Sequence, residues 1–540
     1  MLFTSLLASR ITLMPASVRI FTFILCGGAK EPAETTLAKG LMLMSRYLVT
    51  ITPPTPNGDL HLGHMAGPFL AADVFAKVRK MLGDEVVLLS YADDYQSYMA
   101  RKGEESGEHW LDLSRDNTRK IEKTMLAMGI DADHFMHSGE NGFFIGRVQQ
   151  HLNALAEKGV IKRVEGAVPY DQELEKYGYE AFARGTCPEC GYSTDPSQCE
   201  NCACYPDAGL MANLHSPITK KPLEVVKMTR LAVDMRALSG VLKDHYIKHP
   251  ARRQLGAFID QHVFSGYDQM WPIERTGDAG IPVEFEGADI LVSTWFSGLA
   301  GYEAALTEYW ARKMRPAQAE RFWREGDAKV AHFLGFDCSY SHALIYPAIA
   351  SLVHENPPEI YHYTNAFLKL DNEDFSTSRN YAIWAGEFVA EHGVDAVRFF
   401  LAIKAPEEVP ENFSLKEFLA WKDEYLRIGK SLLSVNTAGV SLSLSLAEAF
   451  ARWRSVVDKS GFSMRSYASF IWDLFASFSQ SSDELERQEK AALIAMLSGP
   501  LLPDLSKQMA SEYLASLYGR LLAGATAPLT AEALAECEAF

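Results

Sequence analysis

Cysteine is scarce in this sequence, with 8 residues among 540. This scarcity excludes a disulfide scaffold and indicates a reducing compartment. The 37 glycines and 24 prolines follow no period, which excludes collagen-like and solenoid repeats. No apolar run reaches the ~18 residues that cross a bilayer, so we expect no membrane partner.

Positive charge is also in deficit, because 52 Lys and Arg stand against 69 Asp and Glu, a net charge of −17 at pH 7. Binding to nucleic acid needs basic side chains that displace the counterions of phosphate. Net charge is a bulk property, however, so a local basic track on an acidic protein can still hold a nucleic acid. The remaining composition, 48% hydrophobic and 22% charged, is that of a globular protein of several domains.

The N-terminal residues 1–44 differ from the rest, because three basic residues precede the first acid, Glu31. Such a start is typical of an organelle targeting segment, and the alternative is that translation begins near Met44. Under either interpretation the segment lies outside the fold. We expect a cytoplasmic protein, or an organellar one if this segment is a transit peptide.

From residue 47 the chain alternates between strand and helix. The β-rich run YLVTIT ends at Pro53, and a polar loop leads into a stretch where Leu70, Val74 and Val78 recur at helical spacing until Gly83. EVVLLSYADD then has the composition of a second buried strand. This order predicts an α/β fold with a parallel sheet and crossover helices.

Two later regions break the alternation. The first holds most of the cysteines among turns and short strands, which predicts an insertion, and the second contains only amphipathic helical stretches, which predicts an all-α bundle. The predicted division is an extension at 1–44, two halves of an α/β core at 45–160 and 246–405, an insertion at 161–245 and a helical bundle at 406–540.

The segment PTPNGDLHLGH carries the first candidate site. His61 and His64 lie three residues apart at the start of the expected helix, so they project from one face toward the end where N–H groups and the helix dipole favour anions. Gly63 lets a flat or bulky group approach closely. The pattern predicts a seat for phosphate and purine, with metal ligation or simple capping as the alternative.

Four cysteines form two CxxC pairs, Cys187 with Cys190 and Cys199 with Cys202. Four thiolates in this arrangement suit one tetrahedral structural zinc, because no position is left open for catalysis. Free thiols or a disulfide pair are the alternatives. Cys204 falls two residues beyond the second pair, and we expect it to take no part.

The segment that contains His61 and His64 resembles the HIGH box of class I aminoacyl-tRNA synthetases, in the form typical of methionyl-tRNA synthetases. The resemblance implies a Rossmann-like core split by a zinc-binding connective insertion and followed by a helical anticodon-binding domain. It also implies that the protein uses ATP and Mg²⁺ to activate an amino acid as its adenylate, and that tRNA accepts the acyl group. Both histidines would then act in catalysis, and five residues of the box would bind ATP: Asn57, Gly58, His61, Gly63 and His64.

Three further segments are similar to this family. Asp94 follows the second strand at the carboxyl edge of the sheet, where the family's acid binds the α-amino group; a helix cap or solvated loop is the alternative. HFLGFDCSYSH resembles a family motif that contacts adenosine and ribose through Gly335 and Asp337. The amino-acid pocket implied by these matches consists of Pro53, Thr55, Asp94, Trp295, Tyr302, Cys338 and His342.

The implied pocket is not a standard methionine pocket. Thr55 replaces a tyrosine, Cys338 stands where the family often has isoleucine, and Phe336 replaces a lysine. On general grounds, the aromatic pair Trp295 and Tyr302 is also compatible with a purely structural role in the core.

The segment DFSTSR occupies the place of the family's KMSKS loop, whose lysines bind the triphosphate. Both lysine positions are changed, to Asp374 and Thr377. Losing one such donor can cost about 10²–10³ in rate, although Lys369 is close in sequence and Mg²⁺ can carry part of the charge. The catalytic candidates left in this loop are Ser376, Thr377, Ser378 and Arg379.

The C-terminal bundle carries more acids than bases, and Trp421, Trp453 and Trp472 could stack on nucleotide bases or lie in the core. These features leave two alternatives to a tRNA ligase. One is a paralogue that adenylates an amino acid for a non-tRNA acceptor, and the other is a catalytically silent RNA-binding or regulatory relative.

Overall fold

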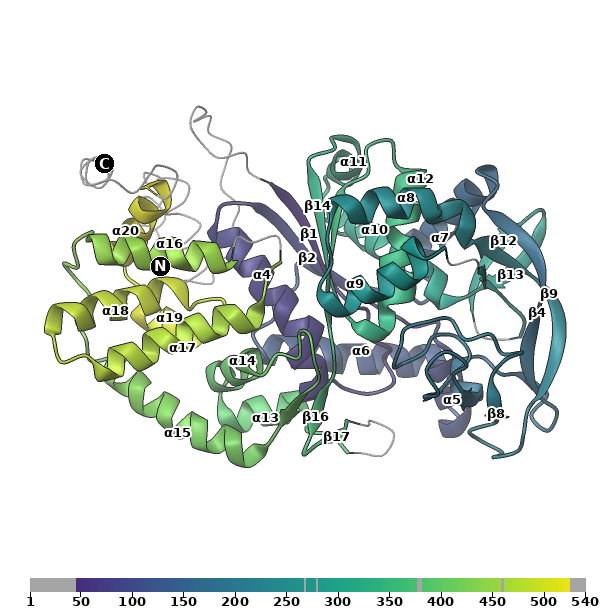
Figure 1. The fold of residues 1–540 in the computed structure, drawn as a ribbon, viewed down its shortest axis with the longest axis horizontal. Helices are drawn as coiled ribbons and strands as arrows, with labels where there is room; N and C mark the ends of the chain where they lie inside the picture. Colours follow the sequence, from purple (N-terminus) through teal and green to yellow (C-terminus); the bar gives the residue numbers. More distant parts are fainter. Residues whose placement is uncertain (1–44, 267–268, 278–279, 376–380, 458–460, 525–540) are drawn as a thin grey trace.

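The computed structural model describes residues 45–266, 269–277, 280–375, 381–457 and 461–524. Five parallel strands form its central sheet in the order β15-β14-β1-β2-β3 (Figure 1). Their bounds are β1 Arg46–Ile51, β2 Glu85–Ala92, β3 His134–His137, β14 Ala328–Gly335 and β15 Glu359–Asn365. The predicted α/β fold with a parallel sheet is therefore confirmed.

Strand β1 is buried along its whole length, as expected of a central parallel strand covered on both faces. Tyr47, Val49 and Ile51 point into one hydrophobic core, and Leu48 points into the other. The connecting helices are α4 Leu70–Met81, α5 Ser97–Ser106, α6 Trp110–Ala127, α7 Gly142–Glu157, α10 Thr294–Arg312, α11 Ala317–Arg324 and α12 Tyr346–Val353.

The helix after β1 is broken, in contrast to the continuous helix that its spacing predicts. A short α3, Leu62–His64, passes into a π-helical turn, Met65–Phe69, before α4 begins. Pro68 lies inside this turn, and Gly67 adopts non-helical angles with φ −94° and ψ −123°. A Cβ at Gly67 would lie 2.6 Å from the side-chain nitrogen of Asn365, so the close approach of β15 requires a glycine there.

Most of the described strands outside the central sheet lie between β3 and β14 in the sequence, and β16 Leu368–Leu370, β17 Glu373–Asp374 and β18 Glu411–Phe413 form a small sheet after β15. The longest of these strands, β4 Ile161–Asp171 and β9 Glu224–Asp234, form an antiparallel pair. The smaller strands are β5 Lys176–Tyr177, β6 Arg184–Thr186, β7 Ser193–Thr194, β8 Ala212–His215, β10 Met270–Pro272, β11 Glu274–Arg275, β12 Ile281–Phe285 and β13 Ala288–Val292. Two helices, α8 Met235–Lys248 and α9 Arg253–Ile259, follow β9.

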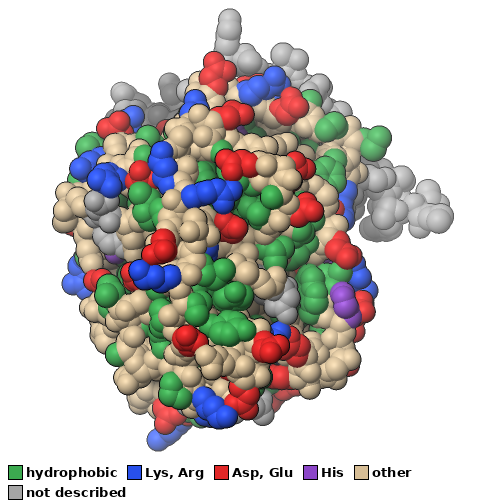
Figure 2. Space-filling view, turned by 90° about the vertical axis from the view of Figure 1, so that its right-hand side faces the viewer, with side chains coloured by type: hydrophobic (Ala, Val, Ile, Leu, Met, Phe, Trp, Pro, Cys, Tyr) green, Lys and Arg blue, Asp and Glu red, His purple; other side chains and the backbone are tan. Residues whose placement is uncertain are grey.

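Figure 2 looks onto the side of the molecule that carries this insertion. Acidic and basic side chains are interspersed there with apolar ones. Within the described ranges, no helix is long and apolar enough to cross a membrane.

Helices alone follow β18, Glu411–Phe413, in the described part of the chain, and they form a bundle on the side opposite the insertion (Figure 1). Trp453 is fully buried, and Trp421 and Trp472 pack against the same core. The helices after β18 are α15 Leu415–Leu432, α16 Leu444–Val457, α17 Met464–Gln480, α18 Glu484–Leu497, α19 Pro503–Met509 and α20 Glu512–Gly524, and α13 Ala385–His392 and α14 Val394–Ile403 come before β18.

A buried arginine joins this bundle to the α/β core. Arg398 of α14 pairs with Asp73 of α4 at 2.6 Å and donates to the carbonyl oxygen of Met128 at 2.8 Å. Its side chain is fully buried, so the guanidinium depends on these partners.

Candidate active site and metal centre

His61 and His64 form the start of α3 and bond to each other's backbone. The Nδ1 atom of His61 accepts from the Gly63 amide at 3.1 Å, and the Nδ1 atom of His64 accepts from the His61 amide at 3.2 Å. The rings stack with centroids 3.9 Å apart. Because each Nδ1 is an acceptor, the ring proton lies on Nε2, and both rings are left as neutral N–H donors.

The surroundings keep these rings neutral at pH 7. Burial, and then the neighbouring His64, lowers the pKa of His61 to about 2. Burial alone lowers the pKa of His64 to about 4. The pair can therefore donate hydrogen bonds to an anion at neutral pH without a titration step.

The sequence-predicted ATP residues lie at the carboxyl edge of the sheet, where β1 and β14 end. Asn57 and Gly58 belong to the loop after β1, and Asp337 follows Gly335 at the end of β14. A neighbouring lysine, Lys102 of α5, donates to the carbonyl oxygen of Asn57. This edge is the usual ligand position of an open α/β sheet.

The same loop is anchored from α6. Asn117 donates to the Pro56 carbonyl oxygen at 2.9 Å, and Thr124 donates to the Asp59 carboxylate at 2.9 Å. A backbone bond of 3.1 Å from the Asp93 amide to the Pro54 carbonyl ties it to the end of β2. Pro53 and Thr55 lie in this loop, beside the end of β2, as the sequence predicts.

Asp94 accepts three hydrogen bonds from neighbours within the fold. Its buried carboxylate accepts from Ser138 Oγ at 3.0 Å, from the Gly139 amide at 2.7 Å and from Ser114. The adjacent Asp93 accepts a hydrogen bond from Gln96 at 2.7 Å. No pattern in the sequence singles out Asp93, although it is the other half of the same acid pair.

Tyr91, near the end of β2, lies close to the predicted side-chain pocket, with its ring centroid 5.4 Å from that of Tyr302. Burial raises the pKa of Asp93 to about 7, with Asp94 acting in the same direction and Gln96 against it. Burial raises the pKa of Tyr302 and of Cys338, and the carboxylate of Asp93 acts in the same direction. The structure thus brings the end of β2 together with two residues predicted to line the pocket.

Tyr302 and His342 meet in the core, as their predicted shared pocket requires. The Tyr302 hydroxyl and His342 Nε2 are 3.1 Å apart, and Ser341 Oγ lies 3.0 Å from His342 Nδ1. Burial lowers the pKa of His342 to about 4, so the ring is neutral at pH 7. This wall of the site is polar but uncharged.

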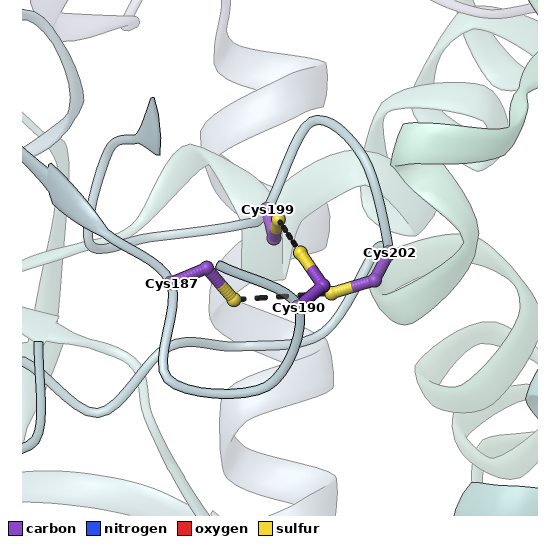
Figure 3. A group of neighbouring side chains, drawn as sticks. All are labelled: Cys187, Cys190, Cys199 and Cys202. Atoms are coloured by element: carbon purple, nitrogen blue, oxygen red, sulfur yellow. Dashed lines mark hydrogen bonds between the residues drawn. The ribbon is translucent and has the colours of Figure 1, made fainter. Parts of the chain in front are cut away.

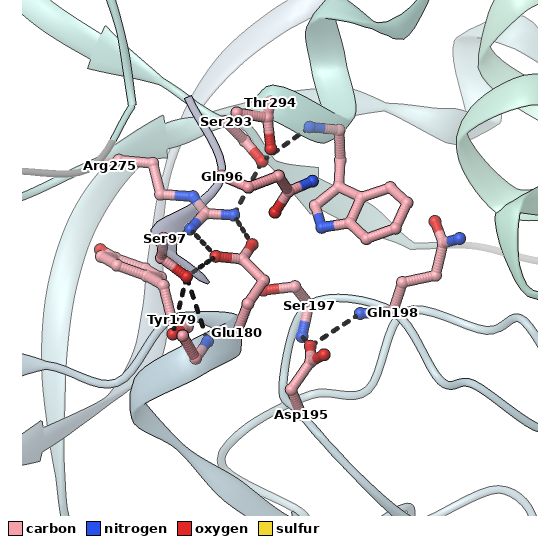
Figure 4. A network of polar contacts seen from close by, with 12 residues as sticks. Gln96, Ser97, Tyr179, Glu180, Asp195, Ser197, Gln198, Arg275, Ser293 and Thr294 are labelled. Carbon is pink, nitrogen blue, oxygen red and sulfur yellow. Dashed lines mark hydrogen bonds and ion pairs between the residues drawn. The ribbon is translucent and has the colours of Figure 1, made fainter. Parts of the chain in front are cut away.

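Trp295 is held at the start of α10 by a buried ion pair that sequence analysis missed. Arg275 of β11 donates to both carboxylate oxygens of Glu180 and, at 2.8 Å, to Ser293 Oγ (Figure 4). Ser293 in turn caps the helix by accepting from the Trp295 amide at 3.3 Å. Arg275 lies inside the segment WPIERTGD between a glutamate and a threonine, so no local pattern marks it as a buried residue.

The four predicted metal ligands meet in one place (Figure 3). Their sulfur atoms all lie within 4.8 Å of one another, with 3.9 Å between Cys187 and Cys202 and 3.6 Å between Cys190 and Cys199. A tetrahedral zinc with Zn–S bonds of ~2.3 Å has sulfur–sulfur edges of about 3.8 Å. The cluster therefore fits such a metal. Cys204, expected to take no part, lies in contact with it.

Comparison with known proteins agrees with this geometry. A family model described as "tRNA synthetases class I (M)" matches residues 47–427. The chain belongs to this family. It is therefore a class I synthetase, as the HIGH-like segment predicts.

Individual relatives support the same assignment. The chain is 29% identical over 389 residues to the methionine–tRNA ligase of Rubrobacter xylanophilus, covering 69% of this chain and 67% of that protein. It is 28% identical over 403 residues to the enzyme of Chloroherpeton thalassium, of whose length it spans 55%.

A solved structure shares the fold. The methionyl-tRNA synthetase of Mycobacterium tuberculosis bound by methionyl-adenylate superposes with a TM-score of 0.63 at 17% identity, covering 88% of this chain and 93% of that one. The synthetase fold with a cysteine cluster in the insertion and C-terminal helices is thereby confirmed.

The start of the KMSKS-like loop lies over the histidines. The Phe375 ring stacks on His61 with centroids 4.9 Å apart and an angle of 12° between the planes. Asp374 pairs with Lys369 at 3.8 Å, so this carboxylate has a counter-charge. The remaining candidates, Ser376, Thr377, Ser378 and Arg379, fall outside the described residues.

Proposed function

We propose that this synthetase activates methionine or a related amino acid with ATP as the aminoacyl-adenylate and transfers the acyl group to tRNA. One observation carries the proposal. The neutral His61–His64 pair holds its Nε2–H donors at a helix N-terminus on the carboxyl edge of a parallel sheet.

The chemistry follows from the pair. Attack of the amino-acid carboxylate on the α-phosphate places extra negative charge on phosphate oxygens, and preorganised N–H donors stabilise that charge. A Cβ at Gly63 would lie 2.9 Å from the His61 ring, so glycine preserves the stacked arrangement. Asn57, Gly58, Gly335 and Asp337 are the proposed partners of the nucleotide, which would bind with Mg²⁺.

The proposed amino-acid pocket combines the loop after β1 with α10 and the segment after β14. The acid pair after β2 offers a carboxylate for the α-amino group, and Tyr302 with His342 offers an uncharged polar wall. The relatives are named methionine–tRNA ligases, which supports methionine. Pro53, Thr55, Asp94, Trp295 and Cys338 complete the proposed set.

The four cysteines are proposed to hold one structural zinc. A closed set of four thiolates leaves no open position for substrate, so the metal would shape the insertion and take no part in the chemistry.

A second candidate is adenylation for an acceptor other than tRNA. It is favoured by Asp374, an acid at a position where the family has a lysine. The two candidates are separated by ATP–pyrophosphate exchange with each amino acid, followed by charging of total tRNA. Exchange with charging supports the ligase, exchange without charging supports the second candidate, and ATP binding without exchange refutes both in favour of a catalytically silent relative.

A further inference from the structure

Cys204 lies within the cluster of metal-binding cysteines. Its Sγ atom is 3.3 Å from that of Cys202 and 3.6 Å from that of Cys187, and its side chain is 1% exposed. These separations are as short as those between the four predicted ligands themselves. The fifth thiol therefore stands at ligand distance from Cys187 and Cys202.

The two CxxC pairs make the same turn, which allows a comparison within the chain. In the first turn the Cys187 amide donates to the Tyr192 carbonyl oxygen at 2.8 Å, and in the second the Cys199 amide donates to the Cys204 carbonyl oxygen at 2.8 Å. Tyr192 and Cys204 thus occupy equivalent positions. Tyr192 is 40% exposed, whereas Cys204 is buried against the sulfurs. The turn itself does not require this position to face the metal.

The residue before each of these positions has a left-handed backbone. Gly191 has φ 74° and Ala203 has φ 60°. Glycine adopts this conformation freely, but an alanine is strained in it because its Cβ approaches the following carbonyl oxygen. The second turn keeps this strained alanine directly before the inward-facing thiol.

We propose that Cys204 is a fifth, ligand-competent thiol that shares one corner of the zinc tetrahedron with Cys202. This inference rests on the proposed zinc site. Since zinc takes four thiolates, Cys204 keeps its proton while Cys202 is bound. In the exchange the bond from zinc to Cys202 breaks, a bond to Cys204 forms, and the proton passes from Cys204 to Cys202. The charge of the site is unchanged.

The test removes Cys202 from the full-length protein. Zinc per chain is measured by mass spectrometry and the number of sulfur ligands by X-ray absorption. We expect Cys202→Ala to retain about one zinc with four sulfurs, because Cys204 fills the vacated corner. Cys202→Ala/Cys204→Ala should bind zinc at least tenfold more weakly in a chelator competition.

The matched control is Cys190→Ala, because Cys190 pairs with Cys199 and stands at the other edge of the cluster. Cys190→Ala should bind zinc as weakly as Cys202→Ala/Cys204→Ala does, although it retains Cys204. The proposal is overturned if Cys202→Ala loses as much zinc as Cys190→Ala does. It is also overturned if the zinc in Cys202→Ala has only three sulfur ligands.

A smaller change covers the case in which Cys202→Ala does not fold. Cys202→Ser keeps the size of the side chain, and its zinc has four sulfurs if Cys204 is a ligand, but three sulfurs and one oxygen if it is not. Absence of zinc from the unaltered protein would instead refute the zinc site itself, which separates the two proposals.

Discussion

Removing the charge of Glu180 tests whether its buried ion pair with Arg275 organises the amino-acid site. The side chains are only 2% and 7% exposed, and Arg275 donates to both carboxylate oxygens. Burial alone would raise the pKa of Glu180, but Arg275 overrides this effect and holds the pKa below its ordinary value. The carboxylate is therefore charged at pH 7, and Glu180→Gln leaves the buried guanidinium without the carboxylate that pairs with it.

The expected cost follows from this burial. Breaking a buried pair by removing one partner costs about 3–5 kcal/mol, and the retained amide oxygen places Glu180→Gln near the lower value. At about 1.4 kcal/mol per factor of ten, the ratio of folded to unfolded protein falls roughly 100-fold. Chemical denaturation of the unaltered protein and the variant measures the change.

The double variant Glu180→Gln/Arg275→Met is the control. It removes both charges, so we expect it to recover most of the lost stability, which gives a coupling free energy in a double-mutant cycle. Because Arg275 also donates to Ser293, which caps the helix at Trp295, the single variant should raise the KM for the amino acid more than the KM for ATP. A stability loss below about 1 kcal/mol, or a double variant whose loss equals the sum of the two single losses, would refute the reasoning.

Three further outcomes are expected in pyrophosphate exchange. His61→Ala and His64→Ala should each slow exchange by about 10²–10³, since each removes one preorganised donor, and a change below threefold would exclude the proposed role. Asp374→Lys should speed exchange by placing a cation where the family has one; an unchanged or lower rate contradicts this view of the loop. If Asp93, whose pKa is about 7, must be ionised to hold the ammonium group, kcat/KM for the amino acid should rise with pH up to about 7 and then level off. Asp93→Asn should abolish this rise of kcat/KM with pH. If the pH profile is unchanged, a group other than Asp93 is responsible for it.

Much of the architecture was predictable because it depends on local patterns. The alternation of strand and helix after residue 47 predicts the parallel sheet, and the spacing of two CxxC pairs predicts the cysteine cluster. The histidines three residues apart at a helix start also bond as capping residues do, within one turn. In each case the residues that interact are close in sequence or share a period.

Other features arise from residues far apart in the chain. At the break in the helix after β1, the side chain of Asn365 from another strand comes so close to Gly67 that a Cβ there would lie 2.6 Å from its nitrogen. Arg275 pairs with Glu180, which is 95 residues away in the sequence, so no local pattern predicts the ion pair. Asp93 and Asp94 differ in their partners because Ser114 and Ser138, which are distant in sequence, donate hydrogen bonds to the carboxylate of Asp94.

The sequence by itself determined the kinds of chemistry in this protein: a histidine pair at a helix start, an acid pair after a strand and thiols in metal-binding spacing. Spacing along the chain suffices for these, because one turn of helix or one knuckle fixes the geometry. Only the tertiary structure decided which partners each acid of the pair has, what caps the helix at Trp295 and that Cys204 faces other thiols of the cluster. These depend on packing between distant segments, where burial and unmatched charge set the energies.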